Sequence, residues 1–122
     1  MNTETVSRMN SYFDEQIALC AQKEKALLLE GRTDEANFEK VRANIFDVFR
    51  TVLSAAMKAA KGDSQAAKRF FEEKMAQIPA NWESAFEKAK LHNDTVRMHI
   101  EQIKLDAIRE IRETFSRIVE EA

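Results

Sequence analysis

The chain has 122 residues, of which 44% are hydrophobic and 33% are charged, and its 19 basic and 21 acidic residues give a formal net charge of -2. This length suits a single domain, 1–122, and the composition is that of a globular chain, not of a disordered or membrane-spanning one. Charges of both signs are spread along the chain and create no large positive field for phosphates. We therefore expect one helical domain without a membrane span and without a nucleic-acid partner.

The first predicted element is a helix over about residues 4–30. Its apolar residues from Val6 to Leu28 recur mostly three or four positions apart, which places them on one helix face. The opening residues lack the basic start and the apolar stretch of a secretory signal, so we expect a cytoplasmic protein. Cys20 is the one cysteine, which excludes an intramolecular disulfide, and we expect it to be a small apolar core residue.

A turn at Gly31 separates this helix from a second one that runs to about residue 61. Glycine adopts left-handed dihedral angles without strain, and Thr33 or Asp34 is suited to cap the following helix. The apolar stripe of the second helix is wider than that of the first. We therefore expect the second helix to be the most buried.

The third rod begins after a turn at residues 62–64 and contains the single proline. Apolar residues keep their helical spacing through Pro79, although proline removes a backbone donor and disturbs the preceding turn. This pattern predicts one rod that is kinked at Pro79, with Trp82 continuing the buried stripe and Asn81 as a possible cap of the restart.

The last apolar stripe runs from Val96 to Ile118 and predicts a final helix. Whether it joins the preceding rod depends on residues 91–95, where Asn93 occupies a position that the stripe would fill with an apolar residue. A turn there gives an all-α fold, an antiparallel up-down bundle of four rods of similar length, which we favour. The absence of glycine and proline at residues 92–95 supports the alternative: three shorter helices and one long C-terminal helix that dimerises.

The sequence contains no recognisable catalytic or cofactor-binding motif. A glycine-rich phosphate loop, a zinc-binding His-Glu-x-x-His helix and a nucleophile elbow are all missing. A turn at residues 93–95 would bring His92 and His99 together with Asp94, which is the one arrangement that suggests a metal or acid site. Surface histidines are the simpler interpretation. We expect no catalytic residue, no cofactor, no metal and no enzymatic activity.

The most informative feature for function is an excess of apolar side chains beyond what a narrow helix seam needs. The candidate interaction residues are Phe70, Phe71, Phe46, Leu53, His92 and Asp94. We expect a non-enzymatic protein-protein interaction module that forms a homodimer or binds another protein. The alternative is a carrier of an apolar small molecule or a protein whose amphipathic helices bind a lipid surface.

Three segments carry a resemblance to small uncharacterised all-helical bacterial proteins. These segments are Asp34-Glu35-Ala36-Asn37-Phe38, Ile78-Pro79-Ala80-Asn81-Trp82 and His92-Asn93-Asp94. The resemblance implies a bacterial cytoplasmic source and implies no activity.

Overall fold

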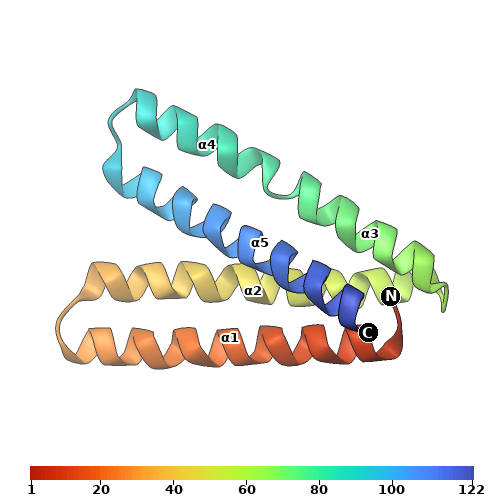
Figure 1. Ribbon diagram of the computed structural model, residues 1–122. Helices are drawn as coiled ribbons and strands as arrows, with labels where there is room; N and C mark the ends of the chain where they lie inside the picture. Colours follow the sequence, from red (N-terminus) through yellow and green to blue (C-terminus); the bar gives the residue numbers. More distant parts are fainter.

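The computed structural model describes residues 1–122 and consists of helices joined by short turns. The helices are α1 (Thr3–Leu29), α2 (Thr33–Ala60), α3 (Ser64–Gln77), α4 (Ala80–Leu91) and α5 (Thr95–Glu121). Figure 1 shows that α3 and α4 follow one another as a single bent rod, so four rods run alternately up and down. The predicted all-α antiparallel bundle and the kink in its third rod are confirmed.

The first two turns are built on left-handed residues, as the glycines predict. Gly31 has φ +75° and Gly62 has φ +91°, values that residues with a side chain rarely adopt. The expected cap of α2 is wrong, because the residue at this position is Arg32, which makes no capping hydrogen bond, while Thr33 is already helical. The cap of α3 is Asp63, whose side chain accepts hydrogen bonds from two backbone N–H groups of the first turn.

The chain also reverses between α4 and α5, so the alternative of one long helix over residues 80–121 is wrong. Asn93 adopts φ +53° and thus supplies the left-handed residue that glycine supplies in the other turns; asparagine tolerates this region better than most residues. Asp94 then caps α5, with Oδ1 accepting a hydrogen bond from the Arg97 backbone N–H at 3.0 Å. The pair Asn93-Asp94 therefore stops one helix and starts the next.

At the kink between α3 and α4, an arginine from another helix replaces the missing backbone donor. Pro79 has no N–H group to donate to the carbonyl of Met75, four residues before it. The guanidinium of Arg112, on α5, donates to this carbonyl instead. The helix restarts with Pro79 in the capping position, where its carbonyl accepts from the Trp82 N–H at 2.9 Å. Asn81 lies inside α4, so its predicted role as a cap is wrong.

The hydrophobic core lies between α1, α2, α3 and the C-terminal half of α5. Four phenylalanines are fully buried there, and Phe71 meets Phe115 edge to face with ring centroids 5.0 Å apart. Cys20 is 3% exposed and belongs to this core, as expected. With seven buried residues against six in α2, α5 is the most buried helix, contrary to the expectation for the second helix.

The two helical hairpins of the molecule diverge from one another. In Figure 1 the α1–α2 and α4–α5 hairpins approach at the end that holds both chain termini and separate towards the other end. The helix pairs that pack against one another are α1–α2, α2–α3, α2–α5, α4–α5 and, less extensively, α1–α5, so α4 packs closely against α5 alone. None of the five helices has the length and apolarity needed to cross a bilayer.

Candidate interaction surface

Residues 80–106, which comprise α4 and the N-terminal part of α5, form a two-helix arm outside the hydrophobic core. Within this arm only Ala89 and Glu101 are buried, and no residue of the core cluster belongs to it. Its larger apolar side chains, such as Phe86 and Ile103, are only half-buried. A helix is stable when its apolar stripe packs against another element. The arm therefore carries apolar surface that this chain does not cover.

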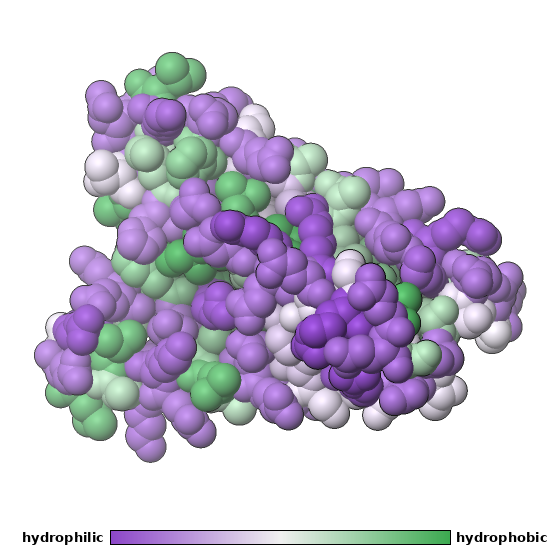
Figure 2. Space-filling model, in the orientation of Figure 1, coloured by the Kyte–Doolittle hydropathy of each residue, from purple (hydrophilic) through white to green (hydrophobic).

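The most exposed apolar side chains lie at the tips of the two hairpins. Leu91 and Val96, at the tip of the arm, are 79% and 63% exposed, and Leu28 and Leu29, at the end of α1, are 50% and 83% exposed. Both tips lie at the end where the hairpins diverge. Figure 2 shows hydrophobic side chains over this end, whereas the face over the C-terminal half of α5 is mostly hydrophilic. Leu19 and Met57 are also exposed, but less so, and the four most exposed large apolar side chains thus lie at one end of the molecule.

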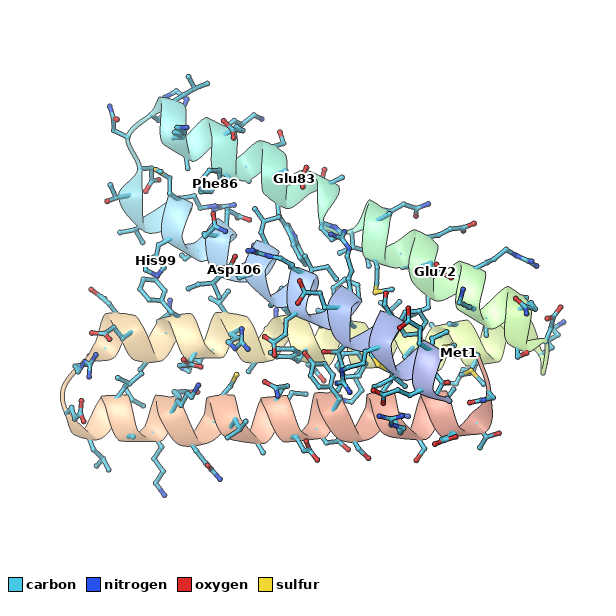
Figure 3. All side chains as sticks on the ribbon, in the orientation of Figure 1. Met1, Glu72, Glu83, Phe86, His99 and Asp106 are labelled. Atoms are coloured by element: carbon cyan, nitrogen blue, oxygen red, sulfur yellow. The ribbon has the colours of Figure 1, made fainter.

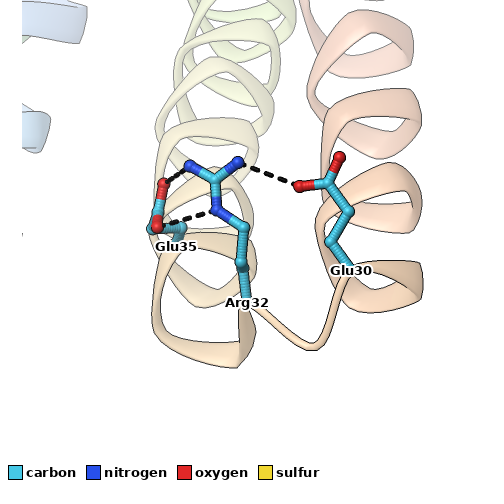
Figure 4. Close-up of polar contacts among 3 residues, drawn as sticks. All are labelled: Glu30, Arg32 and Glu35. Atoms are coloured by element: carbon cyan, nitrogen blue, oxygen red, sulfur yellow. Dashed lines mark hydrogen bonds and ion pairs between the residues drawn. The ribbon is translucent and has the colours of Figure 1, made fainter.

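We call residues 26–36 the hairpin tip and residues 88–98 the arm tip. In the hairpin tip, Arg32 lies between two carboxylates: its guanidinium donates to Glu30 at 2.9 Å and also to Glu35 (Figure 4). The hydrogen bond from Arg32 lowers the pKa of Glu35. Because a bidentate arginine pair has a defined geometry, it holds the turn around Gly31 in one shape.

The arm meets the rest of the chain through a few aromatic contacts. The imidazole of His99 stacks on Phe38 of α2, with ring centroids 4.2 Å apart and ring planes 5° from parallel. Figure 3 shows His99 pointing from α5 towards α2. Nearer the core, Trp82 meets Phe49 of α2 edge to face, with ring centroids 6.4 Å apart. Within the arm, the ammonium of Lys104 lies 5.8 Å from the centroid of the Trp82 ring.

Two shallow grooves separate α4 from α5 along the arm. One, with a volume of about 320 Å³, is lined by residues that include Phe86, His99 and Asp106 (Figure 3). The other, of about 250 Å³, is lined by Lys88, Arg97 and neighbouring residues near the arm tip. Both grooves are lined by a mixture of apolar and polar side chains, and protein-binding surfaces are mixed in the same way.

Glu101 is a buried carboxylate that the sequence pattern did not predict. It is 1% exposed, and its Oε1 accepts hydrogen bonds from Arg97 Nε at 3.0 Å and from Lys104 Nζ at 3.2 Å. Its Oε2 is buried without a partner. The signal that could have identified it is its spacing: it lies seven residues before the core residue Ile108, with a basic residue four positions before it and another three positions after it. A buried carboxylate needs such partners.

A group of half-buried polar side chains lies near Cys20, where α1, α2 and α5 meet. Arg42 donates to Glu110 at 2.6 Å. Burial raises the pKa of the Tyr12 hydroxyl above its usual value. Burial, with a contribution from the nearby Glu39, also raises the pKa of the Cys20 thiol. A thiol with a raised pKa stays protonated at neutral pH and is a weak nucleophile.

Three of the predicted interaction residues belong to the core. Phe46, Leu53 and Phe71 are each 0% exposed, so the prediction that they contact a partner is corrected: their side chains are already covered within this chain. Phe70 is half-buried, and the ammonium of Lys74 lies 5.5 Å from its ring. Wide apolar stripes here indicate contact with several helices of the same chain, since α2 packs against α1, α3 and α5.

The other predicted residues, His92 and Asp94, lie exposed at the arm tip. The carboxylate of Asp94 is engaged in capping α5, and His99 points away towards Phe38. No set of three or more His, Cys, Asp or Glu side chains is arranged to hold a metal ion. The structure therefore does not assemble the metal or acid site that these three residues suggest.

No protein-family model, no curated protein and no solved structure matches this chain. The resemblance to small bacterial helical proteins therefore stays a prediction, and the surface itself is the basis for a functional proposal.

Proposed function

We propose that the protein is a non-enzymatic helical interaction module that binds a protein partner through the arm and through the hairpin tip at the same end of the molecule. The observation that carries this proposal is that residues 80–106 bury only two side chains, while Leu91 and Val96 at the arm tip are largely exposed. Exposed apolar side chains gathered at one end of a small protein are typical of an interaction site. Covering them by a partner removes apolar surface from water.

The proposal includes a cytoplasmic site of action and self-association as a homo-oligomer. A cytoplasmic location is supported by Cys20, a lone thiol in a chain without disulfides, which is typical of a reducing compartment. Self-association is supported by the concentration of apolar residues at one end, because two copies can cover the same surface on one another.

A photo-crosslinking residue placed at position 91 tests the function directly in the cells that make the protein. We expect discrete adducts with one or a few proteins, including the protein itself. The matched control places the same residue at Asn10, which is exposed on α1 near the end of the molecule opposite the two tips, and we expect no discrete adduct there. Equal labelling from both positions, or none from either, would contradict the proposal.

The second candidate, a carrier of an apolar small molecule, is favoured by a groove between α3 and α5. This groove has a volume of about 470 Å³, and Met75, Phe115 and Val119 provide its apolar lining. This volume lies in the range of small-ligand sites. Native mass spectrometry of the purified protein separates the two functions: a bound apolar molecule that is lost on Val119→Glu supports the carrier, and a ligand-free dimer supports the interaction module.

A further inference from the structure

The two tips lie at the end where the hairpins diverge, which we call the open end of the molecule, and they carry opposite net charges. The hairpin tip contains three acidic residues and one basic residue, a net charge of -2, and the arm tip contains three basic residues and one acidic residue, a net charge of +2 with neutral histidine. Asp34 in the hairpin tip and Lys88 and Lys90 in the arm tip make no ion pair within the chain. Each tip also exposes two large apolar side chains. Each tip is thus complementary to the other.

We propose that two copies of this chain associate end to end, with the arm tip of each copy against the hairpin tip of the other. The inference rests on the proposed interaction function and names its partner and its geometry. In Figure 1 the arm tip lies above the hairpin tip at the same end of the molecule. If a second copy is rotated by 180° in the plane of the figure and placed against this end, its hairpin tip lies above its arm tip, so each arm tip faces a hairpin tip of the other copy. The two contacts are then identical, as a two-fold symmetric interface requires.

The proposed contact combines an apolar centre with complementary charges. Leu28 and Leu29 of one copy cover Leu91 and Val96 of the other, and these side chains are between 50% and 83% exposed in the single chain. The interface is confined to the tips and is therefore small, so we expect a dissociation constant on the order of micromolar. Opposite charges at the rim select this pairing and accelerate association.

The same charges disfavour two other partners for this end of the molecule, namely a second copy bound arm to arm and an anionic lipid surface. An arm-to-arm dimer would place Lys88 and Lys90 opposite the same residues of the second copy, and like charges in contact are a common device against wrong pairing. An anionic lipid surface would attract the arm tip but repel the hairpin tip, which reaches the same end of the molecule. A second copy satisfies both tips at once.

Sedimentation equilibrium of the full chain between about 1 and about 500 µM tests the association. We expect a reversible dimer. Replacing Leu91→Ser together with Val96→Ser should raise the dissociation constant at least about tenfold, because this removes the apolar half of both contacts. The matched control is Leu19→Ser, since Leu19 is 45% exposed on α1 outside the tips, and we expect no change. Circular dichroism melts establish that each variant is folded.

A charge exchange tests the pairing itself. The arm variant carries Lys88→Glu and Lys90→Glu, and the hairpin variant carries Asp34→Lys. In a dimer of the arm variant, two tips of net charge -2 face one another at both contacts. In a dimer of the hairpin variant, the attraction between opposite charges is lost at both contacts. Each variant should therefore bind itself at least about tenfold more weakly than the parent protein. An equimolar mixture should form more dimer than either variant alone, because in the mixed dimer one contact keeps its natural charges and the other joins a tip of net charge -2 to a tip of net charge 0, without repulsion.

The outcomes separate this inference from the function on which it rests. The tip-to-tip contact is overturned if the arm variant and the hairpin variant both dimerise as well as the parent protein, or if the arm variant alone does so. A protein that stays monomeric at all concentrations but crosslinks a different protein from position 91 overturns it while leaving the interaction function. A monomer that instead floats with anionic vesicles overturns both in favour of a lipid surface.

Discussion

Replacing Arg112 should destabilise the protein through a carbonyl on a different helix. Pro79 leaves the backbone carbonyl of Met75 without its helical donor, and the Arg112 guanidinium supplies one from α5. Met75 itself is 5% exposed, and Arg112 lies exposed beside it in the groove between α3 and α5. We therefore expect Arg112→Leu to leave this carbonyl poorly satisfied and to loosen the contact of the kinked rod with α5.

The expected loss is about 2 kcal/mol, because hydrogen bonds to charged groups contribute about 1.5–3 kcal/mol. The entropy of unfolding scales with chain length at about 2.1 cal/mol/K per residue, so for this chain about 2 kcal/mol lowers the melting temperature by roughly 8 °C. Arg112→Lys keeps a charged donor in less favourable geometry and should lower the melting temperature by roughly half as much.

Thermal and urea unfolding, followed by circular dichroism, measure these changes, and Pro79→Ala provides the decisive background. An alanine at position 79 has an N–H group that can donate to the Met75 carbonyl, so the same Arg112→Leu change should then have an effect well below about 1 kcal/mol. If Arg112→Leu has the same effect in both backgrounds, Arg112 does not act through this carbonyl and the reasoning fails.

Three further changes test other parts of the structure. Asn93→Leu should destabilise the protein by about 1 kcal/mol, because leucine tolerates φ +53° poorly, whereas Asn93→Gly should stay within about 0.5 kcal/mol of the parent; equal effects in urea unfolding would contradict a left-handed turn. Cys20, which is buried and has a raised pKa, should react with a disulfide reagent at least about 100-fold more slowly in the folded than in the urea-unfolded protein; similar rates would contradict its burial. Glu121, whose pKa is lowered by a hydrogen bond from Arg8, stabilises the folded state when ionised and loses this effect as the pH falls through its lowered pKa. The melting temperatures of the parent and Glu121→Gln should therefore differ near neutral pH and converge once the pH falls below the lowered pKa, and a constant difference would count against the pair.

Much of the fold could be predicted from the sequence because its first two turns and its kink occur at glycine and proline, whose backbone dihedral angles differ from those of other residues. Gly31, Gly62 and Pro79 divide the chain at the positions where the structure turns or bends. The turn at Asn93 was harder to predict, since asparagine is compatible with both a helix and a left-handed cap. The alternating charges on the outer face of α5, including Arg109 and Glu113, are exposed as helical spacing indicates.

The candidate surface could be predicted only in part, because the apolar period of a helix does not say which part of it is covered. Val96 continues the same stripe as Ile111 and Ile118, yet it is 63% exposed while they are buried. The angle between the two hairpins decides this difference, and it depends on packing across the bundle. Glu101 was missed for the related reason that a carboxylate next to the stripe resembles a surface residue. Only the contacts with Arg97 and Lys104 explain its burial.

The position of the arm outside the core has a consequence for the dynamics of the protein. Backbone amides exchange with deuterated solvent through local openings, and the free energy of an opening reflects the apolar contacts that it breaks. The N-terminal part of α5 breaks few such contacts, whereas its C-terminal half is anchored by Ile111, Phe115 and Ile118. A single continuous helix should therefore contain amides of two very different protection levels, and binding at its free end should slow the faster set.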